Sequence, residues 1–343
     1  MHMIEEWDRG VVGYREIYGE TWHRMAQYQV IDGGVPLDDA YKVVGYSVEK
    51  QPVGFRKKDG TWGESPGRYS LVRTDTPENI LLHTAVSDRF ECLDNETLLR
   101  YVEEVLLSKY PDVTIDSVGT LQNGKHCFVS VNLGFNNVAQ DPSDIVGKLM
   151  YVNKYGDGAL PVVAHTTRVV CHNTMTNAIA SGAATNDMRK FRHTSGVYEK
   201  LSQHMLDLAE IKMHMNAQRI ALEGAVGVGM NQEQVSRVVS ALLPLQEDAS
   251  ERSIGMVTRK RDKIVERWDS DWDLQGKLRH TAYSMVQAIV AYADHDTMGR
   301  SDDAYVYMDG LQGERNRFKN RGISIVGEVA GVPSLLEFAG QPA

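Results

Sequence analysis

The sequence predicts an α+β fold, in which an antiparallel sheet built from hairpins packs against helices and is followed by a mainly helical region. Turn-forming dipeptides separate strand-like stretches in the first half of the 343 residues, and apolar residues at helical spacing dominate from about residue 195. We therefore expect a sheet domain over residues 1–185 and a helical domain with an irregular polar tail over residues 186–343.

Three hairpins account for most of the expected strands. Their turns are Asp59-Gly60, Asn123-Gly124 and Asp157-Gly158, dipeptides that tolerate the positive φ angles of a two-residue type I′ turn. The strands that they join are 46–49 with 69–72, 113–118 with 126–131, and 148–152 with 160–164, the last continuing to residue 170. Apolar and polar residues alternate from 126 to 133, which places Cys127, Val129 and Val131 on one face.

Two helices are expected within the sheet domain. The first runs from Glu96 to Leu107 with Asn95 as its cap, and the second begins at Asn173 or Thr174, which are good capping residues. The first half of the chain then has the order β-β-α-β-β-β-β-α, with helices on one side of an antiparallel sheet.

Four helices are expected after residue 195. The first carries leucine or methionine every seven residues between 197 and 222, which suits either a monomer core or a contact between subunits. The others are a helix that follows Asn231 and ends at Pro244, a basic helix that leads to Trp268, and a helix over roughly 277–293. The tail after Asp294 is expected to be irregular.

The composition argues against several classes of protein. No apolar run approaches the roughly 18 residues of a membrane span, and the N-terminal residues lack the apolar core of an export signal. Three scattered cysteines are too few for a disulfide framework. We expect a cytoplasmic protein with no membrane partner.

One stretch matches most of a phosphate-binding P-loop. It runs from Gly119 to Lys125, but His126 stands where a serine or threonine would hold magnesium. A P-loop also opens a helix, whereas this stretch is expected to be a turn between two strands. An ordinary turn with a solvated lysine is the better interpretation.

Metal and nucleophile motifs are incomplete. His165, His172 and Asp294 with His295 could ligate a metal, but they lack the usual ligand spacing. Cys171 beside His172 is the pair that suits nucleophilic catalysis, although a small buried cysteine is the commoner role. We expect neither a metal nor another cofactor.

Basic clusters are the stronger functional signal. The net charge of −9 comes mainly from residues 1–150, with 15 basic against 23 acidic residues, whereas residues 151–343 are nearly balanced. Cations beside aromatic residues can follow a phosphate backbone, although a solvated helix face explains each cluster equally simply. A further cluster lies at 315–321. The candidate nucleic-acid-binding residues are Arg168, Arg189, Lys190, Arg192, Arg259, Lys260, Arg261 and Lys263.

Six short motifs are distributed through the chain. They are Trp22-His23, Ser87 to Glu96, Thr167 to Thr174, Arg192-His193-Thr194, Thr281-Ala282-Tyr283 and Tyr292 to His295. Together they resemble a phage- and plasmid-like protein family of unknown function, found in prophages, plasmids and actinobacterial phages. No catalytic set is established for that family, so the resemblance implies none. The chain departs from it after Trp22-His23, where Arg-Met-Ala replaces the frequent Gly-Leu-Gly.

The order of hairpins, strands and helix is also similar to the β-β-β-α core of single-strand annealing proteins, including phage recombinases of the Red beta type. That similarity implies oligomers that hold single-stranded DNA in a groove between sheet and helices, lined by Arg168, Arg189, Lys190 and Arg192.

We therefore predict a nucleic-acid-binding protein of a mobile genetic element that anneals single-stranded DNA in phage recombination, as a homo-oligomer without enzymatic activity. Two alternatives stay open. One is an anti-defence protein whose acidic first half binds a host enzyme in place of DNA. The other is a metal-dependent enzyme that acts on nucleic acid.

Overall fold

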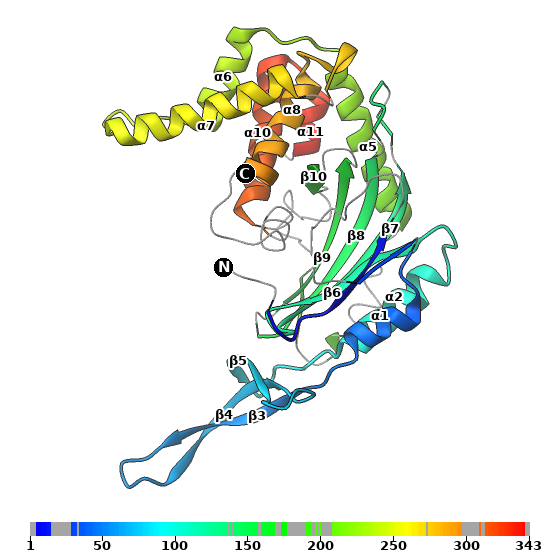
Figure 1. Cartoon of the computed structure of the whole chain (residues 1–343), viewed down its shortest axis with the longest axis vertical. Coiled ribbons are helices and arrows are strands. Elements are labelled where there is room, and N and C mark those ends of the chain that lie inside the picture. Colours follow the sequence, from blue (N-terminus) through cyan, green and yellow to red (C-terminus); the bar gives the residue numbers. More distant parts are fainter. Residues whose placement is uncertain are drawn as a thin grey trace.

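The computed structural model describes residues 5–14, 29–32, 34–135, 137–138, 140–143, 145–156, 159–168, 173–176, 190–193, 196–197, 199, 208–271, 274–296, 309 and 313–339. Two sheets come first along the chain and a group of helices follows (Figure 1). The α+β class is confirmed. The boundary between residues 185 and 186 stays a prediction.

The larger sheet has eight strands in the order β10-β9-β8-β7-β6-β1-β2, with β11 also paired to β9. Its pairs are antiparallel except β1 with β2, which are parallel. The strands are β1 (Gly10–Tyr14), β2 (Gln29–Asp32), β6 (Thr114–Leu121), β7 (His126–Phe135), β8 (Ile145–Lys154), β9 (Ala159–Arg168), β10 (Asn173–Thr176) and β11 (Lys190–Arg192).

The expected alternation in β7 is confirmed. Cys127, Val129 and Val131 lie in one core with α1 (Leu37–Val44) and α2 (Asn95–Val102). Helix α2 continues into a π-helical turn, η1 (Glu103–Leu107). Side chains on the opposite face of β7, such as those of Phe128 and Ser130, are buried too. The central strands are therefore covered on both faces.

The smaller sheet consists of β3 (Val48–Arg56), β4 (Trp62–Arg73) and β5 (Ile80–Ser87). Figure 1 shows the β3–β4 hairpin extending away from the rest of the chain. Only the base of this sheet has a core, in which Leu71 and Leu82 pack with Tyr155 from beyond the end of β8. The distal part is left exposed on both sides.

The helices of the second half pack around α8, whose side chains are buried along its whole length. Helix α6 begins after Asn231, as expected, and Gln234 completes a capping box there. The elements are α5 (Leu208–Val226), α6 (Gln232–Leu242), α7 (Glu251–Ser270), η2 (Gly276–Leu278), α8 (Ala282–Ala291), η3 (Tyr292–Asp296), α10 (Glu314–Ala330) and α11 (Pro333–Ala339).

The cap of α2 is Asp94, and the prediction of Asn95 was wrong. A carboxylate oxygen of Asp94 accepts a hydrogen bond of 2.6 Å from the backbone N–H of Thr97. Asn95 is buried instead, and its side-chain oxygen accepts a hydrogen bond of 2.8 Å from the amide of Asn153.

The prediction of a helix beginning at Asn173 or Thr174 was also wrong. Residues 173–176 form β10, which pairs with Arg168 back to His165 of β9. A short segment rich in threonine suits a strand, and β9 offers it backbone partners that local sequence cannot reveal.

The tail after Asp294 is not irregular throughout, because α10 and α11 lie within it. The polar sequence of α10 hides a close packing contact. A Cβ atom on Gly322 would lie 2.6 Å from the side chain of Ile289 in α8, so only glycine allows the two helices to approach this closely.

Candidate nucleic-acid interface

The distal half of the β3–β4 hairpin is a two-stranded ribbon with exposed aromatic side chains. Strand β5 pairs with β4 only between Arg68 and Arg73, so residues 54–64 have no third strand from the described part of the chain beside them. Phe55 is 52% exposed and Trp62 is 75% exposed. Two large rings exposed this fully beside one turn indicate a contact surface.

Phe55 lies on what we call the first face of the ribbon. It pairs across the hairpin with Gly63. A Cβ atom on Gly63 would lie 2.9 Å from Cζ of Phe55 and 2.8 Å from Cε of Lys57. The ring and the lysine stem therefore cover the glycine together, and a side chain at position 63 would have to push these two ends aside.

Trp62 lies on the opposite, second face. It pairs with Arg56, which follows Phe55 in the strand and so points the other way. A Cβ atom on Gly54 would lie 3.4 Å from Cε2 of Trp62, so the indole ring rests over this glycine. Each face of the ribbon thus carries one aromatic ring and one cation.

The turn leaves its cations without acidic partners. Among the described residues, no carboxylate lies within ion-pair distance of Arg56, Lys57 or Lys58. Asp59 is committed to the turn, since it accepts hydrogen bonds of 2.6 Å from the Thr61 hydroxyl and 2.9 Å from the Thr61 backbone N–H. These two hydrogen bonds lower the pKa of Asp59, and the bond from the Thr61 hydroxyl has the larger effect.

The turn itself is longer than the two-residue type expected. The N–H of Lys57 donates to the carbonyl oxygen of Thr61 at 2.8 Å, and Gly60 has a φ of 85°. Asp59 does not have the positive φ that a type I′ turn requires. In the second hairpin, Asn123 and Gly124 both have positive φ as expected, whereas Asp157-Gly158 lies outside the described residues.

The charge of the hairpin is opposite in sign to that of the whole chain. Residues 48–73 contain six basic and three acidic side chains, against a chain total of −9. Because binding follows the local field, an acidic protein can present this ribbon as an electropositive arm.

Lys50 anchors the ribbon near its base. Its ammonium group donates hydrogen bonds of 2.9 Å to the carbonyl oxygens of Asp88 and Phe90 and lies 4.8 Å from the centre of the Tyr69 ring. This cation is therefore structural, unlike those at the turn.

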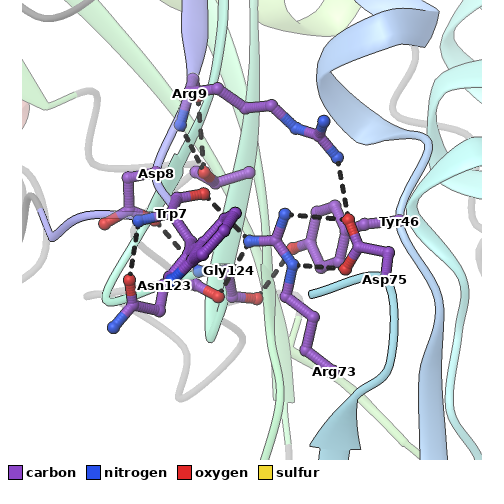
Figure 2. A network of polar contacts seen from close by, with 9 residues as sticks. Trp7, Asp8, Arg9, Tyr46, Arg73, Asp75, Asn123 and Gly124 are labelled. Atoms are coloured by element: carbon purple, nitrogen blue, oxygen red, sulfur yellow. Dashed lines mark hydrogen bonds and ion pairs between the residues drawn. The ribbon is translucent and has the colours of Figure 1, made fainter. Parts of the chain in front are cut away.

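Arg73, the last residue of β4, is the centre of a buried polar network (Figure 2). Its Nε and Nη2 donate to the two carboxylate oxygens of Asp75 at 2.6 and 3.1 Å. Its Nη1 donates to the carbonyl oxygens of Trp7 and Asn123, both at 3.0 Å. One guanidinium group thus connects the ribbon to the N-terminal segment and to the β6–β7 turn.

Tyr46 completes this network beneath the guanidinium group. Arg73 lies 4.4 Å from the centre of the Tyr46 ring, and the Tyr46 hydroxyl donates to the carbonyl oxygen of Gly124 at 2.7 Å. The carboxylate of Asp8 accepts from the N–H of Gly124 at 2.9 Å (Figure 2). The base of the ribbon is therefore fixed to the larger sheet by bonds whose geometry is specific.

The P-loop-like stretch is part of this network. Gly119 belongs to β6, and residues 122–125 form the turn into β7, so no helix follows. The motif therefore lacks the context of a phosphate-binding loop, and its Gly124 serves the contact with Arg73.

The structure places the predicted cations of the sheet at opposite ends of β9. Arg168 ends this strand, whereas Lys190 and Arg192 in β11 pair with Pro161 and Ala159. Seven to nine residues at about 3.3 Å each separate the two positions by roughly 20–30 Å. Arg189 lies outside the described residues.

The predicted cations of α7 lie in a third place. Arg259, Lys260 and Lys263 are exposed on a helix that extends away from the others (Figure 1). Arg261 is occupied locally, since its Nε and Nη2 donate to the carbonyl oxygen of Leu243 at 3.1 and 2.7 Å. The predicted residues therefore do not form one continuous strip.

The basic cluster at 315–321 is neutralised or bonded within the fold. Its cations make contacts to acidic groups and to one carbonyl oxygen: Arg315 to Asp309 at 3.2 Å, Arg317 to Glu314 at 3.5 Å, Lys319 to Asp294 at 2.8 Å and Arg321 to the carbonyl of Ala241 at 2.9 Å.

Two buried ion pairs, one in the larger sheet and one in the helices, lie near His165. Lys148 of β8 pairs with Asp116 at 2.8 Å, and Lys319 of α10 pairs with Asp294 of η3 at 2.8 Å. His165 of β9 is fully buried, and its pKa is lowered well below 6.5 by burial first and then by the two lysines. Asp294 therefore neutralises the buried Lys319.

In the described part of the chain, no three His, Cys, Asp or Glu side chains gather in a metal-binding group.

The nucleophile candidates receive no support from the described residues. Cys171 and His172 lie outside them. Cys127 is fully buried, and burial raises the pKa of its thiol to about 12. Such a thiol stays protonated and behaves as a small apolar side chain.

The hairpin residues were missed at the level of sequence, although a signal exists. Phe55-Arg56-Lys57-Lys58 and Trp62 flank Asp59-Gly60, which places aromatic and basic residues on both sides of a turn. Aromatic residues at a turn, away from any expected core, favour an exposed functional tip.

Comparison with known proteins gives one result. A family model described as "Domain of unknown function (DUF932)" matches residues 82–317, which is more than two thirds of the chain. The β3–β4 hairpin precedes this range. No curated protein and no solved structure matches the chain. Among the described helices, none combines the length and apolar character that crossing a bilayer requires.

Proposed function

This chain belongs to the DUF932 family, to which no function is assigned, and we propose from the geometry of the hairpin that the protein binds nucleic acid, preferably single-stranded DNA. The β3–β4 ribbon would be the principal contact arm. The observation that carries the proposal is the display of Phe55 and Trp62 beside three cations without acidic partners among the described residues.

The chemistry of the ribbon suits a phosphate backbone with accessible bases. Arg56, Lys57 and Lys58 would release counterions from phosphates, which supplies affinity without sequence preference. Phe55 and Trp62 would stack on bases, and stacking requires bases that are not already stacked in a duplex. This requirement favours single strands over double helices.

The exposed cations of α7 are a second candidate contact. Arg259, Lys260 and Lys263 would extend the site only if the DNA reached from the ribbon to this helix. Arg168, Lys190 and Arg192 stay a proposal of the same kind, supported by their positive charge and by their place in strands of the larger sheet, and Arg189 is supported by its charge alone.

Annealing of complementary strands in a mobile element is the finer form of this proposal. The resemblance of the sequence motifs to phage- and plasmid-like proteins supports it, whereas the β-β-β-α analogy with single-strand annealing proteins loses the helix expected at residue 173, because residues 173–176 form β10. An assay that follows the pairing of two complementary oligonucleotides tests it, and a protein that binds DNA without speeding up pairing would contradict it.

The binding proposal is tested by titrating a labelled 30-nucleotide single strand over a series of salt concentrations. The triple substitution of Arg56, Lys57 and Lys58 by glutamine should reduce the slope of log affinity against log salt by about 2, since each phosphate contact contributes about 0.7. The absence of binding by the unsubstituted protein at low salt would overturn the proposal.

A charge-matched control separates local contact from total charge. Lys212, Arg237 and Lys277 are exposed and lie in α5, α6 and η2, away from the ribbon. Replacing these three by glutamine removes the same charge and should leave the slope unchanged. The corresponding variant of Arg259, Lys260 and Lys263 measures the contribution of α7. An equal loss in the control and in the ribbon variant would contradict the assignment of the site.

A further inference from the structure

The distal ribbon carries the same pair of groups on both of its faces. The first face presents Phe55 with Lys57, and the second presents Trp62 with Arg56. Lys58 lies in the turn between them. A surface that binds one partner from one side needs only one such face. The duplication indicates that a ligand passes the ribbon on both sides.

We propose, on the basis of the nucleic-acid binding proposed above, that residues 54–64 are a wedge that recognises the junction where a duplex opens into two single strands. One strand passes along the first face and stacks a base on Phe55. The other strand passes along the second face and stacks a base on Trp62.

The junction is the form of nucleic acid that matches two opposed rings. Apolar side chains that enter a duplex must unstack base pairs, which costs free energy at every step. At a junction the last bases are already free, so both rings can stack without that cost. The cation beside each ring, Lys57 or Arg56, lies where it can contact the phosphates of the same strand.

A glycine lies beneath each of the two rings. Gly63 lies under Phe55 and Gly54 lies under Trp62, so each ring rests on backbone. The outer side of each ring is then free to receive a base, in agreement with the exposed fractions of 52% and 75%. A Cβ atom at Gly63 would have to push the Phe55 ring aside, whereas a Cβ atom at Gly54 would make ordinary van der Waals contact with the Trp62 ring.

The base of the ribbon has the rigidity that a wedge requires. Lys50 is held by two carbonyl oxygens, and Arg73 is bonded to Asp75 and to two carbonyl oxygens of the main body. These bonds fix the base of the ribbon relative to the larger sheet, which is where a wedge would have to be held.

The proposal is tested with three DNA ligands of equal nucleotide number: a fork with two unpaired tails, a single strand and a blunt duplex. The fork should bind about tenfold more tightly than either of the others. Phe55→Ala and Trp62→Ala should each weaken binding of the fork about tenfold, in line with the loss of one stacked base. Leu81→Ala is the matched control, because Leu81 is 54% exposed on the neighbouring β5.

Photocrosslinking then assigns each strand to a face. With 5-bromodeoxyuridine at the first unpaired position of one tail, the crosslink should map to Trp62, and with the label in the other tail it should map to Phe55. Crosslinks of both tails to one face, or a loss of affinity in only one of the two alanine variants, would overturn the wedge.

The outcomes separate this proposal from the one on which it rests. Equal affinity for fork and single strand would leave nucleic-acid binding in place and overturn the wedge. A duplex bound as tightly as the fork would place the ribbon in a groove and overturn it too. Failure to bind any of the three ligands would overturn both proposals.

Discussion

Gly124 lies directly against the guanidinium group of Arg73. A Cβ atom at position 124 would be 2.9 Å from Nη1 of Arg73 and 3.0 Å from Cε2 of Tyr46. Gly124 also has a φ of 91°. The glycine is therefore required twice, by the conformation of the β6–β7 turn and by the side chain that connects the turn to the β3–β4 ribbon.

Gly124→Ala should destabilise the protein by about 1–3 kcal/mol, the cost of a strained backbone conformation together with a displaced arginine. Urea unfolding measures it. Gly60→Ala is the matched control, because Gly60 has a φ of 85° but no atom within 4 Å of an added Cβ. If both variants lose equal stability, the contact with Arg73 contributes nothing.

Arg73→Met should destabilise the protein by about 2–4 kcal/mol, because the carbonyl oxygens of Trp7 and Asn123 lose their buried donor and Asp75 keeps only the more distant Arg9. Hydrogen exchange should accelerate in β3 and β4 while β8 stays protected. Arg9→Met is the control, since Arg9 is 41% exposed and lies 3.4 Å from Asp75, and it should cost at most about 1 kcal/mol. Unchanged exchange in β3 and β4 would show that the ribbon is anchored elsewhere.

The hairpins of the larger sheet could be predicted because their information is local. Asn123 and Gly124 supply the positive φ angles of the turn, and the alternation through β7 identifies the buried face. Strand β1 could not be predicted, because it is short and depends on pairing with β6, about a hundred residues away. The same reason hides the Arg73 network, whose members come from four separate parts of the chain.

Helix α10 and the ribbon show a second limit of prediction. The sequence of α10 includes a lysine, Lys319, that is buried. It can be buried because Asp294 neutralises it, and the spacing of residues in the sequence cannot reveal that partner. In the ribbon, Phe55 and Trp62 resemble core residues until the structure shows that nothing in the described chain covers them. Hydrophobicity alone does not distinguish a core from a contact surface.

Lys319→Met should destabilise the protein by about 3–5 kcal/mol, since Lys319 is 1% exposed and its loss leaves Asp294 buried with a charge. Arg317→Met is the control on the same helix. Arg317 is 73% exposed and pairs with Glu314 at 3.5 Å, so its loss should cost at most about 1 kcal/mol. Chemical unfolding at pH 7 measures both, and equal losses would contradict the role of the buried pair.

His165 should make the protein less stable as the pH falls below about 6.5. In the folded state, burial and the nearby Lys148 and Lys319 keep the pKa of His165 well below 6.5, whereas the unfolded residue titrates at its ordinary value. Between pH 7 and 5.5 the unfolded chain therefore takes up a proton that the folded chain does not. Linkage then lowers the free energy of unfolding by about 1 kcal/mol over this interval.

His165→Gln provides the comparison, because glutamine does not titrate and keeps hydrogen-bonding groups at the site. Both proteins contain His193, whose pKa is also lowered by burial, so its contribution to the pH dependence is common to the two. The change in unfolding free energy between pH 7 and 5.5 should be smaller in the variant by about 1 kcal/mol. Identical pH dependence would mean that His165 takes up its proton without unfolding, with Asp116 and Asp294 near enough to offset the two lysines.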